Sequence, residues 1–153
     1  MSVFELELKL RVEFLPAVPL VDIEKHRKAL SFSGVYFLME SEGEAIHDPL
    51  AGHIIYIGKG IRENIATRGR KHLATMTGAL LKTGNPKTQN SAAFKAYRET
   101  IGLDASGLWF LAGKMDASEP YLISCAEEYF LQQFEKHHGK GPVCNTASLA
   151  RKR

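Results

Sequence analysis

The chain has 153 residues, of which 44% are apolar and 24% charged, which is ordinary for one soluble globular domain. No apolar run approaches the ~18 residues that span a membrane, and the charges at Glu5, Glu7 and Lys9 interrupt the apolar core of any signal peptide. Its two cysteines, Cys125 and Cys144, match neither a disulfide framework nor a zinc site. These features predict a cytoplasmic protein that does not contact a membrane.

The positive charge is concentrated in one segment. The whole chain carries a net charge of only +3. The segment from Lys59 to Glu99 contains nine lysines and arginines but only two acids. It therefore carries a net charge of +7, and the rest of the chain carries −4. A basic segment of this kind predicts a polyanionic partner, most commonly a nucleic acid. The alternative is a positive surface that contacts only solvent.

The N-terminal segment predicts a strand. In the segment Val3–Phe14, apolar and charged residues alternate strictly from Phe4 onward, which is typical of a half-buried strand. Pro16 and Pro19 end it, because proline cannot donate a hydrogen bond to a sheet. Asp22 can then cap a short helix that ends at Leu30. We expect residues 1–32 to belong to the main domain or to pack on it.

A β-hairpin followed by a basic helix is predicted next. Two apolar runs, Val35–Met39 and Ile54–Ile57, read as strands, and the loop Glu40–Gly52 between them is rich in turn residues. Because the two runs are close in sequence, we expect them to pair antiparallel. The basic helix is predicted over Glu63–Met76.

The next predicted elements are a loop, a helix and a strand. Thr77–Asn90 is polar and reads as a loop, with a turn of helix at Ala79–Lys82. Ser91 is a suitable N-cap and Gly102 a suitable terminator for the helix between them. Leu108–Ala112 is a third central strand.

The last predicted element is a long amphipathic helix. It starts at Ser118, with Pro120 in its first turn, and ends at Gly139. We therefore expect an α+β fold with a small central three-stranded antiparallel sheet, flanked by helices and extended by the N-terminal strand. The main domain would cover residues 33–147, followed by a basic tail at 148–153.

A set of polar side chains along these elements is suited to phosphodiester cleavage. The set is Tyr36, Tyr56, Arg68, His72, Glu127 and Asn145. An arginine can hold the scissile phosphate, a carboxylate can hold a divalent metal, and a tyrosine or histidine can relay a proton. Taken singly, each residue has a commoner structural explanation, such as a core tyrosine or a solvated acid.

The order of these residues resembles a known family. The triplets Gly34-Val35-Tyr36 and Tyr56-Ile57-Gly58 resemble the paired signatures of the GIY-YIG endonucleases. The family pattern continues with an arginine and a histidine on the following helix, then a glutamate and a closing asparagine. This sequence offers Arg68, His72, Glu127 and Asn145 in that order, so the resemblance covers Gly34 to Asn145.

The resemblance implies hydrolysis of DNA with one Mg²⁺ or Mn²⁺ ion bound by Glu127. Arg68 would contact the scissile phosphate, Tyr36 or Tyr56 would orient or deprotonate the water with help from His72, and Asn145 would hold the site together. Gly34 and Gly58 would be structural positions of the two triplets. Backbone phosphates would be gripped by Lys59, Arg62, Arg70 and Lys71.

Several alternatives remain open. The gap between the triplets and the spacing to Arg68 are longer than usual in the family, so Arg62 or Arg70 could replace Arg68, and Glu128 could replace Glu127. The chain could also be an inactive nucleic-acid-binding module of the same fold, or an α+β ligand-binding domain that binds no nucleic acid. The N-terminal strand could form the edge of a homodimer. The resemblance suits a prokaryotic or phage host cell, and repair, restriction and mobile-element roles remain open.

Overall fold

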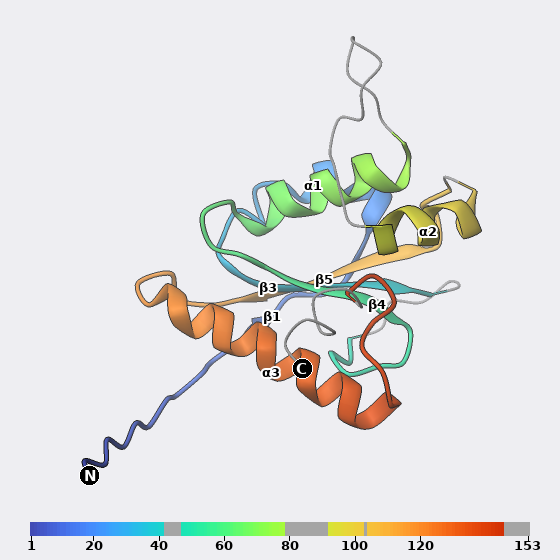
Figure 1. The fold of residues 1–153 in the computed structure, drawn as a ribbon. Helices are drawn as coiled ribbons and strands as arrows, with labels where there is room; N and C mark the ends of the chain where they lie inside the picture. The colour runs from blue at the N-terminus through green and yellow to red at the C-terminus, as the bar shows by residue number, and fades with distance from the viewer. Residues whose placement is uncertain (42–46, 79–91, 103, 146–153) are drawn as a thin grey trace.

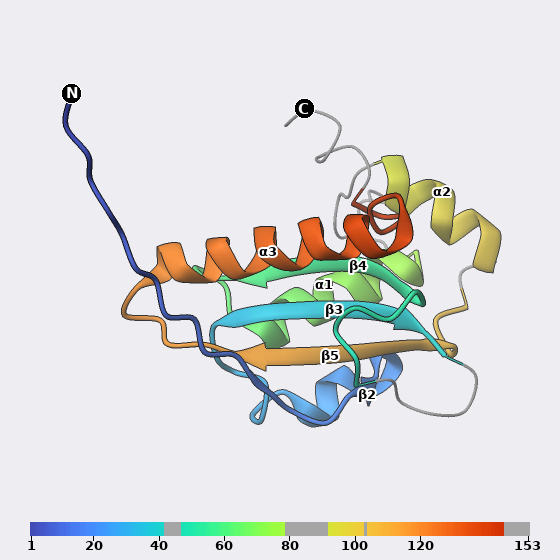
Figure 2. The same ribbon diagram turned by 90° about the horizontal axis from the view of Figure 1, so that it is seen from below.

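The fold is built on one open antiparallel sheet. The computed structural model describes residues 1–41, 47–78, 92–102 and 104–145. Its three long strands are β3 (Gly34–Glu40), β4 (Ile54–Gly60) and β5 (Leu108–Lys114), and its two short ones are β1 (Glu13–Phe14) and β2 (Val18–Pro19). The strand order is β1-β5-β3-β4, and β2 also pairs with β5. The long strands lie side by side in Figure 2, with β3 in the middle and β4 at an edge.

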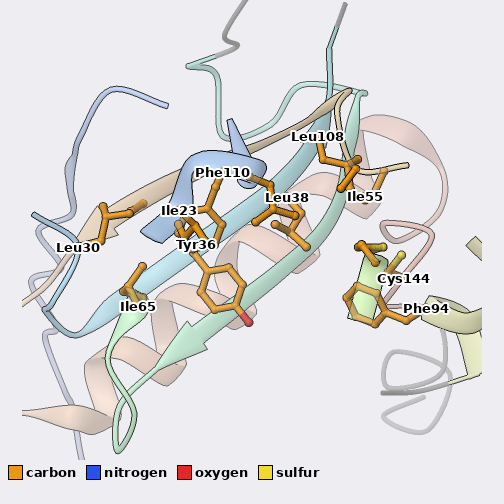
Figure 3. Packing of buried hydrophobic residues seen from close by; sticks show 14 of the residues in the cluster. Ile23, Leu30, Tyr36, Leu38, Ile55, Ile65, Phe94, Leu108, Phe110 and Cys144 are labelled. Atoms are coloured by element: carbon orange, nitrogen blue, oxygen red, sulfur yellow. The ribbon is translucent and has the colours of Figure 1, made fainter. Parts of the chain in front are cut away.

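Helices cover both faces of the sheet. The 3₁₀ helix η1 (Leu20–His26), α1 (Ile65–Met76) and α2 (Ala92–Ile101) cover one face, and α3 (Pro120–His138) covers the other (Figure 1). Because both faces of β3 are buried, that strand reads as a continuous apolar run rather than as an alternating one. The core accordingly has two layers. Tyr36 packs beside Ile23 and Phe110 in the first (Figure 3), and Phe37 packs in the second.

The predicted hairpin is confirmed. β3 and β4 pair antiparallel, with Tyr36 opposite Gly58 and Leu38 opposite Tyr56. The side chains of directly opposite residues lie on the same face of a sheet, so both tyrosines project toward α1 and α2. The α+β class and the third central strand are likewise confirmed.

The predicted N-terminal strand is mostly wrong. Only Glu13 and Phe14 join the sheet, where Glu13 pairs with Lys114. Lys114 is the last residue of β5, so the chain before Glu13 runs past the end of its only neighbouring strand. Residues 1–12 adopt neither helix nor strand and extend away from the body (Figure 1). The sheet therefore has five strands rather than three with one long N-terminal addition.

Several helix boundaries differ from prediction for local reasons. The basic helix starts at Ile65 because the Asn64 side chain accepts a hydrogen bond from the Thr67 backbone N–H. Pro19, not Asp22, occupies the N-cap of η1, which makes no side-chain cap. The last helix starts at Pro120, not at Ser118, whose backbone N–H donates to Asp116.

The first short helix ends at His26 rather than at Leu30, whereas the ends of α1, α2 and α3 match the predictions. Gly102 and Gly139 follow α2 and α3 in left-handed conformations, with φ of 63° and 77°. The turn at Ala79–Lys82, the cap at Ser91 and the tail 148–153 lie outside the described residues. Within the described part of the chain, no helix is both long and apolar enough to cross a membrane.

Candidate active site

Four of the predicted residues come together between β3, β4 and α1. Tyr36 Oη lies 2.6 Å from His72 Nε2. The Tyr56 ring lies 4.9 Å from the His72 ring and 5.9 Å from the Tyr36 ring, measured between centroids. Arg68, one turn before His72 on α1, adjoins both phenols. The hairpin supplies the tyrosines, and the four-residue spacing on α1 supplies their partners.

Two phenylalanines that the sequence did not single out enclose this cluster. Phe94 on α2 lies 5.0 Å from the His72 ring and 4.9 Å from the Tyr56 ring. Phe110 on β5 stacks on Tyr36 at 5.2 Å. In the sequence, both look like ordinary core residues of a helix and a strand. Only the tertiary fold shows that they line the site. They keep water away from Tyr36 and His72, which are buried, whereas Tyr56 is only partly buried.

Burial keeps His72 neutral. Burial, and then the nearby Arg68 charge, together lower the pKa of His72 to about 3. At neutral pH the imidazole is therefore uncharged and can hold the Tyr36 hydroxyl group by a hydrogen bond. Its Nδ1 atom is buried and has no hydrogen-bond partner among the described residues.

Both phenols are also neutral. Burial, and then the neighbouring Tyr56, raise the pKa of Tyr36 well above its usual value, while Arg68 opposes the rise. Burial likewise raises the pKa of Tyr56, where Arg68 opposes the rise and Glu127 adds to it. The site therefore contains two neutral hydroxyl groups beside one permanent guanidinium charge.

Arg68 is distinguished from the neighbouring arginines by its place. It is half-buried, its Nε atom has no hydrogen-bond partner among the described residues, and it lines a hollow of about 580 Å³. Arg62 lines the same hollow from an exposed position. Arg70 instead forms an ion pair with Glu24 on η1 at 2.8 Å. Of the three, only Arg68 combines access to the hollow with contact to the phenols.

The hollow has a basic rim. It lies between the end of β4, the turn into α1 and the start of α3. Its lining includes Lys59, Arg62, Glu63, Arg68, Tyr121 and Ser124. Lys71, which precedes His72 on α1, is exposed and forms an ion pair with Glu63. An anionic group in the hollow would therefore meet several positive charges.

Glu127 reaches the edge of the site from α3. Its Oε1 lies 3.6 Å from Lys59 Nζ on β4, and its side chain is only 18% exposed. Lys59 Nζ also donates to Ser124 Oγ at 3.0 Å. The charge of Glu127 adds to the rise in the pKa of Tyr56. Glu128, by contrast, accepts a hydrogen bond from Gln132 on the exposed side of α3.

The chemistry of Glu127 fits a bound Mg²⁺ ion. Mg²⁺ takes oxygen ligands and is commonly held by one or two carboxylates, with water and substrate phosphate completing its shell. No group of three or more His, Cys, Asp or Glu side chains suited to a metal occurs in the described part of the chain. The arrangement available among the described residues is therefore a single carboxylate beside a basic hollow.

Asn145 closes the outer edge of β4. Its Oδ1 accepts from the Ile57 backbone N–H at 2.8 Å, and its Nδ2 donates to the Ile57 carbonyl at 2.9 Å. The Cys144 backbone N–H donates to the Ile55 carbonyl at 2.8 Å. These bonds satisfy outward-facing groups of an edge strand. Asn145 thus holds β4 in place near Tyr56 and Lys59. The side chains of these two residues lie on opposite faces of the sheet.

The two signature glycines lie at close approaches of the backbone. A Cβ atom at Gly34 would lie 1.9 Å from the Gly113 carbonyl oxygen on β5. A Cβ atom at Gly58 would lie 2.6 Å from the hydroxyl oxygen of Tyr36 and 2.7 Å from Tyr56. The absence of a side chain at Gly58 therefore makes room for the two tyrosine side chains.

We predict that Gly58→Ala displaces the phenols. A methyl group there would lie 2.6 Å from the Tyr36 hydroxyl oxygen, so it pushes Tyr36 away from His72. The free energy of unfolding should fall by about 1–3 kcal/mol because the core is overpacked. Urea unfolding measures this loss of stability. Gly107→Ala is the control, because nothing lies within 4 Å of its Cβ position. Equal effects of both substitutions would contradict the prediction.

The chain matches no family model, no curated protein and no solved structure. The site is therefore described by its own geometry. Tyr36, Tyr56, Arg68 and His72 form one contiguous cluster, and Glu127 and Asn145 lie beside it at the edge strand β4.

Proposed function

We propose that this protein is a divalent-metal-dependent DNA endonuclease of the GIY-YIG type. The observation that carries the proposal is the contiguous cluster of two phenols, a neutral imidazole and a half-buried guanidinium, next to a basic hollow and a partly buried carboxylate. The antiparallel order β4-β3-β5, with Tyr36 opposite Gly58, supports the same assignment.

In this proposal the scissile phosphate enters the hollow and meets Arg68. A guanidinium can hold two phosphate oxygens at once, and its charge offsets the charge that develops as the bond breaks. Lys59 and Arg62 line the same hollow and add positive charge. Arg70 and Lys71 extend the basic surface along α1, where they would hold neighbouring backbone phosphates without reading the base sequence.

Glu127 would bind Mg²⁺ or Mn²⁺. When bound, such an ion neutralises charge on the phosphoryl oxygens and on the leaving group. Lys59, which is paired with Glu127, holds this carboxylate toward β4. The Lys59–Ser124 hydrogen bond in turn fixes the lysine.

The attacking water would be oriented by the phenols. Tyr56 is the more accessible of the two, so it would contact the water directly. Tyr36 lies behind it, held by His72 at 2.6 Å. Since His72 is neutral at physiological pH, its Nε2 can accept a hydrogen bond from the Tyr36 hydroxyl group and no positive charge is added to the site. Tyr56 would first lose its own proton to solvent, and its phenolate would then take a proton from the attacking water. Arg68 opposes the rise in the pKa of each phenol, so it favours that phenolate.

The proposal predicts nicking of supercoiled plasmid by the purified protein in Mg²⁺, and no cleavage after EDTA is added. Gel electrophoresis separates supercoiled, nicked and linear DNA, and mapping of the new ends gives the cut positions. An inactive nucleic-acid-binding module would instead bind DNA with an affinity that falls steeply with salt, and would leave the plasmid intact. Absence of both binding and cleavage would favour a ligand-binding domain unrelated to nucleic acid.

A further inference from the structure

The N-terminal arm, residues 1–12, exposes an unusually apolar strip. It leaves the body at β1 and extends away from it in both ribbon views (Figures 1 and 2). Phe4, Leu6 and Leu8 are 87%, 73% and 53% exposed. Contiguous apolar surface of this kind usually marks an interaction site.

The root of the arm already packs like a strand of the core. Phe14 lies 5.8 Å from the Phe37 ring and 6.1 Å from the Phe130 ring, and Val12 packs against the same cluster. The apolar residues of the arm alternate in phase with these two. A hollow of about 500 Å³ at the root is lined by Leu10, Met115 and Leu122 among others. The arm therefore continues the apolar face that the core begins.

The charges on the opposite face are ordered about a centre at Leu8. Two acids, Glu5 and Glu7, precede it, and two bases, Lys9 and Arg11, follow it. If two copies of the arm pair antiparallel with Leu8 opposite Leu8, Glu7 lies opposite Lys9 and Glu5 opposite Arg11. A parallel pair in register would instead place like charges opposite each other, which is destabilising.

We infer that the arm pairs with the arm of a second copy of this chain, antiparallel and centred on Leu8. In this register Leu6 faces Leu10 and Phe4 faces Val12 across the two strands. All five apolar residues of each arm then lie on one face of the ribbon. The partner's end of the ribbon reaches the root of each arm, beside the hollow lined by Leu10. The complementary charges set the register, as opposite charges do across paired strands.

This inference is independent of nuclease activity, because self-association is measured without DNA. The full-length protein should sediment as a dimer, and the dimer should dissociate on dilution. Glu7→Lys alone and Lys9→Glu alone each place like charges opposite one another twice per dimer. Each should raise the dimer dissociation constant by roughly tenfold or more.

Mixing the two single variants gives the decisive result. In the mixture each Glu7→Lys chain faces a Lys9→Glu chain, and both cross-strand positions again carry opposite charges. The mixture should therefore dimerise as the unmodified protein does, and so should the chain that carries both substitutions. Glu99→Lys, the same charge change at an exposed position on α2, should leave the dimer intact. Failure of the mixture to associate would overturn the register.

A cross-link tests the centre directly. In a background where the exposed Cys125 is replaced by Ser, Leu8→Cys places two thiols opposite each other at a separation that a disulfide spans. Oxidation should give a covalent dimer in high yield. Phe4→Cys should not, because its two copies would lie about 27 Å apart along the ribbon. An unmodified protein that stays monomeric at high concentration, or that associates only with lipid vesicles, would overturn the inference.

Discussion

Glu127→Gln should abolish plasmid cleavage while DNA binding is retained. The substitution keeps the size of the side chain and its place on α3, but it removes the negative charge that would hold the metal. Loss of metal stabilisation worth ~4 kcal/mol corresponds to a rate that is lower by roughly 1,000-fold. Nicking of supercoiled plasmid in Mg²⁺ measures the rate, and a gel-shift titration measures binding.

The adjacent acid is the matched control for this substitution. Glu128 lies on the same helix but hydrogen-bonds to Gln132 on the exposed side, so Glu128→Gln should cleave within a few-fold of the unmodified protein. Thermal unfolding should show both variants folded. Unchanged cleavage by Glu127→Gln would refute the metal assignment. Loss of cleavage in Glu128→Gln alone would move that assignment by one residue.

The central elements could be predicted from the sequence because local patterns dictate them. The apolar run in β3, the turn residues before β4 and the glycines after α2 and α3 each indicate one conformation. Pairing of β3 with β4 then follows from their closeness in sequence. Register places Tyr36 and Tyr56 on one face, and the four-residue step in α1 brings Arg68 near His72.

The N-terminal arm shows where sequence patterns are insufficient. Strict alternation predicts the backbone conformation of a strand, but not the strand that will pair with it. β5 ends at Lys114, opposite Glu13, so the twelve residues before Glu13 pair with no strand in the described part of the chain. An alternating pattern typical of a strand can therefore mark a segment that pairs with another molecule rather than with the sheet of its own chain.

Protonation states could not be read from the sequence either. In the sequence, His72 is predicted only as a group that helps the tyrosines with the proton of the water. Burial among Phe94, Tyr36 and Tyr56 instead lowers the pKa of His72 to about 3. The pairing of Lys59 with Glu127 likewise depends on the contact of α3 with β4, which joins residues far apart in the chain.

Arg68→Lys should lower cleavage roughly 100-fold, the typical cost of one lost donor to developing charge. Lysine keeps the positive charge but cannot hold two phosphate oxygens in one plane. The salt dependence of DNA binding should therefore change little while the cleavage rate falls. Arg98→Lys is the matched control, because Arg98 is also half-buried and its Nε atom also has no hydrogen-bond partner among the described residues, yet it lies on α2.

The same assays separate Arg68 from its neighbours. Arg62→Ala and Arg70→Ala remove a charge from the basic surface, so each should weaken DNA binding and lower its salt dependence by about one counterion. At saturating DNA their cleavage rates should stay within a few-fold of the unmodified protein. Arg70 in particular is held by Glu24 on η1, away from the phenols. A cleavage rate that falls at saturating DNA in Arg62→Ala or Arg70→Ala, but not in Arg68→Lys, would transfer the phosphate contact to that arginine.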